Sequence, residues 1–135
     1  MEFIADTNII VSALLKPGIT RNLIFNRGLD LYSPDFLSQE LEKHKAEFIK
    51  KSGLKDWNYL QAVDLVLSNI SQTPHSEYRE FEAKAKNISP DFNDWPFFAV
   101  ALYKRCDIWS NDKLLKNQKD VRVYSTKEIS GLLRQ

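Results

Sequence analysis

The chain has 135 residues, of which 27% are charged, and its formal net charge is +1. This balance by itself predicts neither nucleic-acid nor membrane binding, and a hydrophobic content of 43% with 12% aromatic residues excludes a disordered chain. No apolar run approaches the roughly 20 residues that cross a bilayer, so no membrane partner is expected. The length predicts a single domain over residues 1–135, and the lone cysteine and the lack of a signal-peptide pattern favour a cytoplasmic location.

The first part of the chain predicts alternating strands and helices. The apolar run 2–5 predicts a short buried strand, and residues 7–15 predict a helix that ends at a Lys-Pro-Gly sequence. A second helix is expected over 20–26, because a threonine begins it and a glycine follows its end. Residues 31–32 then predict another short strand, which a Ser-Pro pair closes.

The middle of the chain is mainly helical in pattern. Apolar residues recur at helix spacing over 35–51, which predicts one helix there. A second helix over 56–68 places Trp57 among the apolar residues of one side. A strand at 70–73 leads to a charged helix over 76–87, which we expect near the surface because it has few apolar positions.

The last part of the chain returns to the alternation of helix and strand. An apolar helix is expected over 95–103, directly after an aspartate, and strands follow at 107–110 and 121–124. A closing helix over 126–133 completes the pattern.

The order of these elements predicts the fold class. Helices, and never two-residue hairpin turns, separate the strands, so the connections are parallel crossovers with helices on both faces of the sheet. We therefore expect an α/β protein, a three-layer α/β/α sandwich with a parallel, Rossmann-like sheet of about four to five strands. Ligands of such folds bind at the carboxyl ends of the strands, near the point where the strand order reverses.

Acidic residues follow or precede the expected strands at that edge. Asp6 follows the first strand, Asp112 follows strand 107–110, and Asp94 begins the helix that leads into that strand. Glu40 lies in helix 35–51, stacked with Phe36 and beside the buried stripe, where it can reach the same place. The topology therefore predicts the three aspartates at one rim of the sheet, and helix periodicity makes Glu40 the fourth candidate for the same site.

Two interpretations of these acids stay open. Each aspartate precedes an expected helix, where Asp is a favoured N-cap, and Pro96 in the first turn strengthens that interpretation for Asp94. Converging carboxylates also repel one another unless a cation binds. Oxygen ligands without a cysteine cluster or a paired histidine favour Mg²⁺ or Mn²⁺. The two roles are compatible, because a cap can orient a carboxylate.

Polar residues accompany the acids. Asn8 and Ser110 are candidate supporting residues, because an amide or a hydroxyl beside a metal-bound carboxylate can orient it or hold a water. Local hydrogen bonding in turns is the alternative, and we favour it for Thr7 and Asn111.

Four segments together resemble the PIN-domain family. ADTNIIVSALL resembles the first-strand motif, in which apolar residues precede D-T-N, and YSPDFLSQELEKH resembles the second acidic segment through Glu40. SPDFNDWPFFAVAL resembles the D-x-x-D-x-P segment, with Asp94 as its main acid and Asp91 as the weaker upstream one. IWSND resembles the fourth segment through Asp112. The segments occur in the family's order over about residues 1–130.

The resemblance implies a Mg²⁺- or Mn²⁺-dependent ribonuclease that hydrolyses RNA phosphodiester bonds. It implies catalytic and metal-binding roles for Asp6, Glu40, Asp94 and Asp112. Small members of the family include toxins of VapBC-type toxin–antitoxin pairs, which a small antitoxin protein inhibits and which often form homodimers. RNA, an antitoxin and a second copy of the chain are thus the implied partners.

Two other functions fit part of the pattern. One is a catalytically inert PIN-like module that binds RNA or a protein, although all four acids are present. The other is an α/β phosphatase that uses Asp6 as its nucleophile. In the dehalogenase type of that fold a second aspartate stands two residues further on as general acid, and here that position is Asn8.

Overall fold

The computed structural model describes residues 1–134 and contains a five-stranded sheet. The strands are β1 (Glu2–Ala5), β2 (Asp30–Pro34), β3 (Ile70–Thr73), β4 (Asp107–Trp109) and β5 (Val123–Tyr124). Their order is β3-β2-β1-β4-β5, and every neighbouring pair is parallel. The predicted parallel α/β fold is therefore confirmed.

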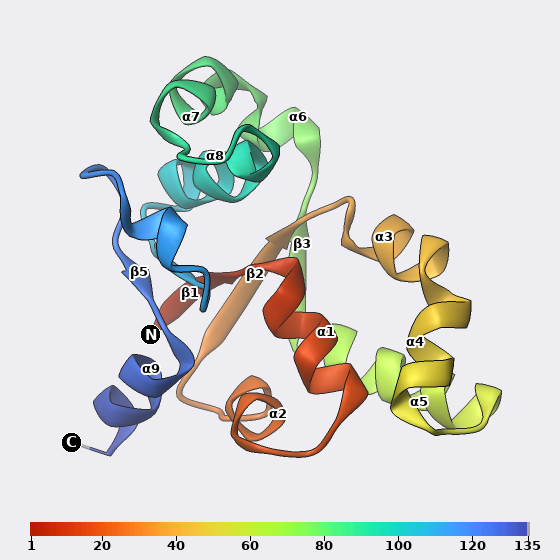
Figure 1. Ribbon diagram of the computed structural model, residues 1–135. Helices are drawn as coiled ribbons and strands as arrows, with labels where there is room; N and C mark the ends of the chain where they lie inside the picture. The colour runs from red at the N-terminus through yellow and green to blue at the C-terminus, as the bar shows by residue number, and fades with distance from the viewer. Residues whose placement is uncertain (135) are drawn as a thin grey trace.

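Helices cover both faces of this sheet (Figure 1). The α-helices are α1 (Thr7–Leu15), α2 (Ile19–Ile24), α3 (Leu37–Lys43), α4 (Lys45–Ser52), α5 (Asp56–Leu67), α6 (His75–Tyr78), α7 (Glu82–Ile88), α8 (Trp95–Lys104) and α9 (Thr126–Leu133). Short 3-10 turns occur at η1 (Arg79–Phe81), η2 (Phe92–Asp94) and η3 (Lys113–Lys116). Helices α6 to α8 lie above the sheet in Figure 1, and α1, α2, α5 and α9 lie below it. No helix within residues 1–134 is long and apolar enough to cross a membrane.

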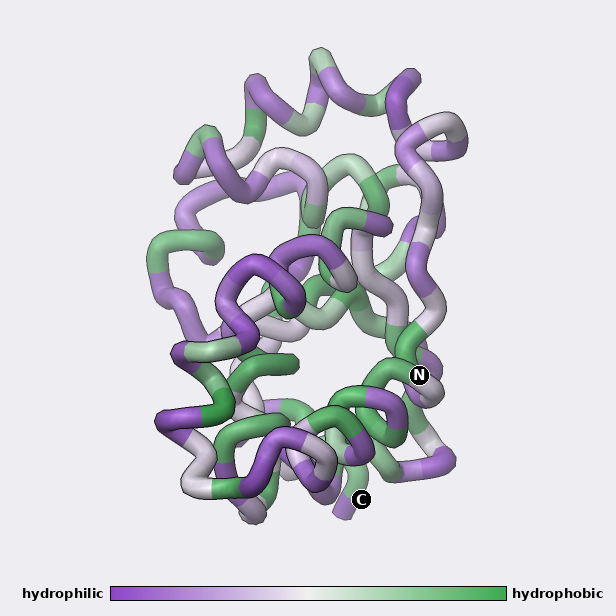
Figure 2. The backbone as a smooth tube through the Cα atoms, turned by 90° about the vertical axis from the view of Figure 1, so that its right-hand side faces the viewer, coloured by the Kyte–Doolittle hydropathy of each residue, from purple (hydrophilic) through white to green (hydrophobic). Residues whose placement is uncertain are grey.

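Successive side chains of a strand pack into two separate hydrophobic cores, one on each face of the sheet. Phe3 and Ala5 pack with α1, α2, α5 and α9, whereas Ile4 packs with α8. The same alternation separates Ile108 from Trp109 on β4. Because both faces of the sheet are covered, the central strands β1 and β4 bury apolar side chains on both faces. Hydrophobic stretches accordingly run through the middle of the molecule (Figure 2).

The order of the strands reverses between β1 and β4. The chain builds the sheet outward from β1 through β2 to β3, and then returns to the other side of β1 for β4 and β5. Ala5 is in register with Trp109, and the Asp6 amide donates to the Trp109 carbonyl at 3.1 Å. The segments that leave β1 and β4 therefore diverge from one point, and such a point in an open α/β sheet forms a crevice.

Two predicted helices are divided in the structure. The helix expected over 35–51 is α3 and α4, which meet at His44, where φ is −104° and ψ is 14°. Helix α3 fully buries Leu37 and Leu41 in the core, whereas α4 has no fully buried residue and packs against the core only through the partly buried Phe48. The charged helix expected over 76–87 is α6, η1 and α7, because this segment wraps around α8 and contacts it along its whole length.

The apolar side of α5 also differs from the expected one. The helix buries Tyr59 and Val66 against α1, α4 and β3, while the Trp57 side chain is 61% exposed. Trp57 lies in the first turn of α5, at the periphery of the molecule.

Candidate active site

Asp6 lies at the carboxyl end of the central strand and is nearly buried, with 7% of its surface exposed. Its Oδ1 accepts a hydrogen bond from the Ile9 amide at 2.8 Å, so it is the N-cap of α1. Burial raises the pKa of Asp6, hydrogen bonds from the Ser110 side chain and the Ile9 amide oppose that rise, and the charge of Asp112 adds to it. The cap therefore fixes the carboxylate in a place where its charge is costly.

Ser110 and Asp112 come from the neighbouring strand. Ser110 directly follows β4 and is buried, and its hydroxyl lies close enough to the Asp6 carboxylate to oppose the rise in the pKa of Asp6. The same hydroxyl oxygen accepts from the Asp112 amide at 3.0 Å, and Asp112 Oδ1 accepts from the Leu114 amide at 3.0 Å to cap η3. One buried hydroxyl thus connects the segments that carry two of the predicted acids.

Asp94 occupies the N-cap position of α8 but does not cap it. Its side chain makes no capping hydrogen bond, which corrects the interpretation that Pro96 strengthens. In the preceding turn, Asp91 Oδ1 instead accepts from the Asn93 amide at 3.0 Å. Burial and then the negative charges of Asp91, Asp6 and Asp112 raise the pKa of Asp94 to about 6. Asp94 is thus a carboxyl group in an acidic surrounding.

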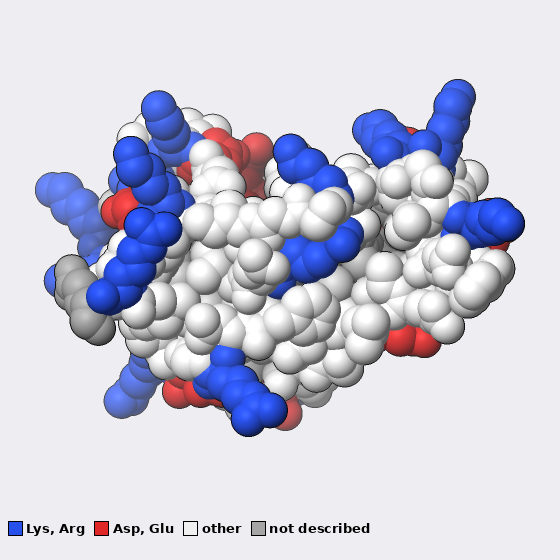
Figure 3. Space-filling view, turned by 90° about the horizontal axis from the view of Figure 1, so that it is seen from below, with Lys and Arg blue, Asp and Glu red and all other residues white. Residues whose placement is uncertain are grey.

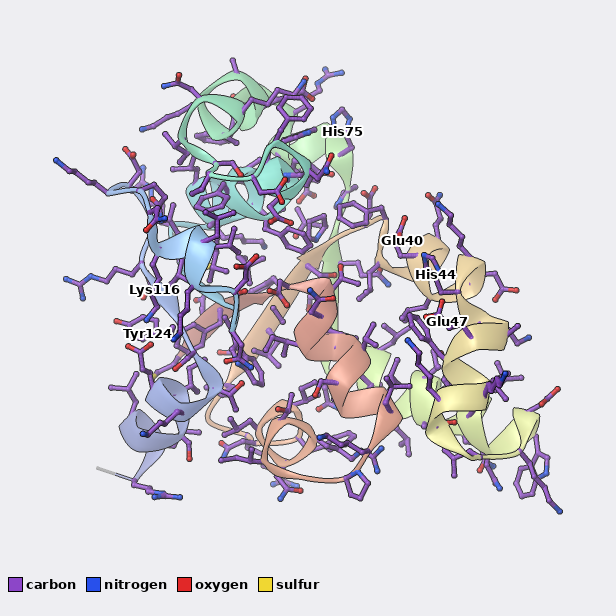
Figure 4. The ribbon with its side chains drawn as sticks, viewed as in Figure 1. Glu40, His44, Glu47, His75, Lys116 and Tyr124 are labelled. Atoms are coloured by element: carbon purple, nitrogen blue, oxygen red, sulfur yellow. The ribbon has the colours of Figure 1, made fainter. Side chains whose placement is uncertain are left out.

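Glu40 reaches the site from α3. Its side chain is 41% exposed, and its Oε2 lies 3.7 Å from His44 Nε2, one helical turn further on. Figure 4 shows Glu40, His44 and Glu47 following one another along α3 and α4. The Glu40 amide donates to the Phe36 carbonyl at 3.0 Å, so the two residues are one helical turn apart, and both line the same cavity.

A cavity of about 390 Å³ unites these groups. All four predicted acids line it, together with Thr7, Asn8, Phe36, Asn93 and Phe97. Its lining residues come from the end of β1, from α1, α3, η2 and α8, and from the segment that follows β4. A larger cavity, of about 680 Å³, lies between α2 and α9, and its lining residues include no acid. The four carboxylates therefore share one hollow at the switch point of the sheet.

The candidate supporting residues differ in their positions. Asn8 lines the cavity. Ser110 and Asp91 lie outside the cavity lining, Ser110 next to Asp6 and Asp91 close enough to Asp94 for its charge to raise the pKa of Asp94. Asn111 bonds to Thr126 through both its amide nitrogen and its oxygen, so it joins two elements rather than closing a local turn. Asn93 also lines the cavity, and its place directly before Asp94 is the only sequence signal that could have found it.

The chemistry of the donors suits a hard divalent cation. They are carboxylate oxygens, and the pKa values of Asp6 and Asp94 are raised first by burial and then by neighbouring negative charges, which a bound cation would neutralise. Within the part of the chain that the structure describes, however, no three His, Cys, Asp or Glu side chains stand close enough together to ligate one ion. Ligation therefore requires side-chain rotation, which the exposed Glu40 and Asp112 can make.

On the face formed by α2, α5 and α9, Lys and Arg side chains are more visible than acids (Figure 3).

The raised pKa of Asp94 predicts a pH dependence of the metal-free protein. Because the folded chain holds this proton more tightly than the unfolded chain, the stabilisation from Asp94 is complete below its ordinary pKa of 3.8 and is lost as the pH rises through about 6. Urea unfolding in EDTA from pH 4 to 7 should thus show a free energy of unfolding that falls less steeply with pH in Asp94→Asn than in the unsubstituted chain. Equal slopes would contradict the prediction.

Comparisons with known proteins concern nearly the whole chain. Residues 4–131 match the model of the family described as PIN domain. No curated protein matched. Among solved structures, a chain in the crystal structure of VapBC2 from Rickettsia felis bound to a DNA fragment from their promoter superimposes with a TM-score of 0.64. That likeness covers 93% of this chain and 98% of that chain at 18% sequence identity, so it concerns the fold alone.

Proposed function

The chain belongs to the PIN-domain family, and from this premise we propose that it is a Mg²⁺- or Mn²⁺-dependent ribonuclease that hydrolyses RNA phosphodiester bonds. Membership of a family whose members are generally nucleases supports a hydrolase that acts on nucleic acid. The observation that carries the proposal is the single cavity lined by Asp6, Glu40, Asp94 and Asp112 at the switch point of the sheet.

The four acids are the residues that would hold the metal. When bound, a divalent cation lowers the pKa of a water molecule and neutralises charge at the scissile phosphate. Asp6 is held in one orientation by its cap to α1 and by Ser110, so it provides a fixed carboxylate. Asp94 has no competing cap, and its proton leaves near pH 6. Glu40 lies on α3, and its side chain is 41% exposed. In this proposal it orients the attacking water and accepts the proton of that water.

Protein partners follow from the same premise. The structural neighbour is a chain of a complex named VapBC2 that is bound to promoter DNA, and this supports a small antitoxin protein as the partner of this chain. We therefore propose a toxin role within a toxin–antitoxin pair, and a homodimer as the assembled form. Copurification of the chain with the product of a short neighbouring reading frame would test the first, and light scattering the second.

A cleavage assay tests the activity. Purified protein is incubated with labelled single-stranded RNA in millimolar Mn²⁺ or Mg²⁺. The control is the same reaction with EDTA in place of the divalent ion. Cleavage that needs the divalent ion supports the proposal. Absence of cleavage with either ion, in protein that binds RNA, would favour the inert binding module instead.

Ser110→Ala should reduce cleavage without removing any acid. The substitution deletes the hydroxyl that lies next to Asp6 and accepts from the Asp112 amide, so the Asp6 carboxylate loses its orientation and its pKa rises further. Loss of such an outer partner typically lowers activity by about 10- to 100-fold. The matched control is Ser33→Ala, which removes an equally buried hydroxyl that bonds only to the Pro34 carbonyl. Equal losses in both variants would show a general effect of packing.

A further inference from the structure

An exposed aromatic ring stands beside the acidic cavity. Phe92 is 63% exposed and begins η2, the turn whose next two residues, Asn93 and Asp94, line the cavity. A phenyl ring left in water contributes nothing to the core, and this one lies in the segment that delivers an acid to the site. Its position makes it a neighbour of whatever the cavity binds.

A lysine lies over this ring and over a second one. Lys86 Nζ is 5.5 Å from the centroid of the Phe92 ring and 5.2 Å from that of Trp95, within the range of cation–π attraction. Glu82 Oε2 holds the same ammonium group at 3.0 Å. We call Phe92, Lys86 and Trp95 the aromatic platform.

The platform has a firm base. The Trp95 ring packs against Tyr78, with 6.1 Å between centroids, and against His75, at 6.4 Å. Tyr78 is buried in the core on this side of the sheet, and Trp95 is partly buried against that core. Figure 4 shows His75 at the start of α6. Two rings of different exposure and one cation thus lie together, and in the chain the two rings flank Asn93 and Asp94, which line the cavity.

Single-stranded nucleic acid matches this chemistry. An unpaired base offers a π face for Phe92, and the phosphate beside it offers a negative charge for Lys86. A duplex keeps its bases stacked on one another, so it offers the ring no such face. An apolar peptide would not use the cation. The proximity to the acidic cavity further favours an occupant that continues from a phosphate bound there.

We propose that the aromatic platform is a subsite that stacks one base of single-stranded RNA next to the scissile phosphate, with Phe92 as the stacking residue and Lys86 at the adjoining phosphate. This inference rests on the proposed function, since it assigns the neighbour of a phosphate held at the acids. It makes Phe92 and Lys86 substrate-positioning residues rather than catalytic ones.

The test measures binding apart from cleavage. All proteins carry Asp94→Asn, which preserves the RNA, and the fluorescence anisotropy of a labelled single-stranded ten-nucleotide RNA gives the Kd in Mg²⁺. Adding Phe92→Ala should raise the Kd by at least about fivefold, as base–aromatic stacking usually does, and Phe92→Trp should restore it. Lys86→Met should weaken the salt dependence of binding. Trp57→Ala, which removes an equally exposed aromatic on α5, is the matched control and should leave the Kd unchanged.

A second measurement observes Trp95 directly. The chain has three tryptophans, Trp109 is fully buried, and Trp57→Phe leaves Trp95 as the tryptophan nearest the RNA. Its fluorescence should be quenched by the single-stranded RNA and not by the same sequence in a duplex.

The outcomes separate this inference from the proposed function. If the RNA binds but Phe92→Ala has the same Kd, the platform is not an RNA subsite, although the nuclease proposal stands, and a protein partner becomes the occupant to test. If Phe92→Ala weakens binding while the chain with Asp94 intact cleaves no RNA, the platform stands and the nuclease proposal fails. If no single-stranded RNA binds at all, both are overturned.

Discussion

Asp94→Asn should lower the rate of RNA cleavage by more than about 100-fold while leaving the protein folded. Loss of an outer partner of a metal-bound group costs about 10- to 100-fold, and a carboxylate in the cavity itself should cost more. Asparagine keeps the shape of the side chain but removes the charge. Because Asp94 makes no capping hydrogen bond to α8, the substitution takes no interaction away from the helix. The rate is measured on labelled single-stranded RNA in Mn²⁺, with circular dichroism to verify the fold.

The control for this substitution is a partly buried aspartate on the sheet, at the end of β4 that lies away from the cavity. Asp107 begins β4, opposite Phe3 in the register, and therefore lies at the edge of the sheet away from the cavity. Burial raises its pKa as well, so Asp107→Asn also removes a partly desolvated charge. It should leave cleavage unchanged. A rate for Asp94→Asn within a few-fold of that for Asp107→Asn would refute the assignment of Asp94 to the active site.

The convergence of the acids on one cavity could be predicted from the sequence. Parallel strands that alternate with helices bring all their carboxyl ends to one edge, so Asp6 and Asp112 had to meet wherever their strands became neighbours. Their strands are in fact adjacent, with Ala5 in register with Trp109. Glu40 could be placed through helix periodicity alone, because residues four apart, such as Phe36 and Glu40, lie on the same face of a helix. In the structure both residues line the cavity.

Other features depend on tertiary contacts that the pattern does not contain. The division at His44 occurs where full burial gives way to partial burial, since α3 buries Leu37 and Leu41 while α4 contacts the core only through the partly buried Phe48. The absence of a cap at Asp94 depends on the turn η2, whose cap comes from Asp91 three residues earlier. The pattern D-x-x-D supplies two candidates for one role, and only the backbone of the turn decides between them.

The pattern indicates Ser110 as a candidate supporting residue, but it does not show which acids Ser110 serves. A serine before an acid most often bonds within its own turn, and Ser110 does bond to the Asp112 amide. Its second contact, to Asp6, exists because β1 and β4 are neighbours in the sheet. A residue that joins two strands can be identified only after the strand order is known.

Millimolar Mn²⁺ should raise the melting temperature of the chain by more than about 5 °C. A ligand that binds only the folded state adds about 2.7 kcal/mol when its concentration is 100 times its Kd, and 1 kcal/mol shifts the midpoint of a domain of this size by several degrees. The binding energy comes from relief of repulsion among carboxylates, because Asp6 and Asp94 both have pKa values raised by burial and by the other acids of the cavity. Scanning fluorimetry in EDTA and in Mn²⁺ measures the shift.

Asp6→Asn should raise the melting temperature of the metal-free protein and should remove most of the further increase that Mn²⁺ causes. Asparagine is as good an N-cap as aspartate, so α1 keeps its first hydrogen bond while a buried charge disappears. Because burial raises the pKa of Asp6, its charge destabilises the metal-free fold, so the metal-free variant should melt at a higher temperature than the unsubstituted chain at pH values where this carboxylate is charged, and it should gain little from Mn²⁺. Asp107→Asn should respond to Mn²⁺ like the unsubstituted chain. If the unsubstituted chain gains no stability from Mn²⁺, the acids hold no cation, and the inert binding module becomes the better description of the cavity.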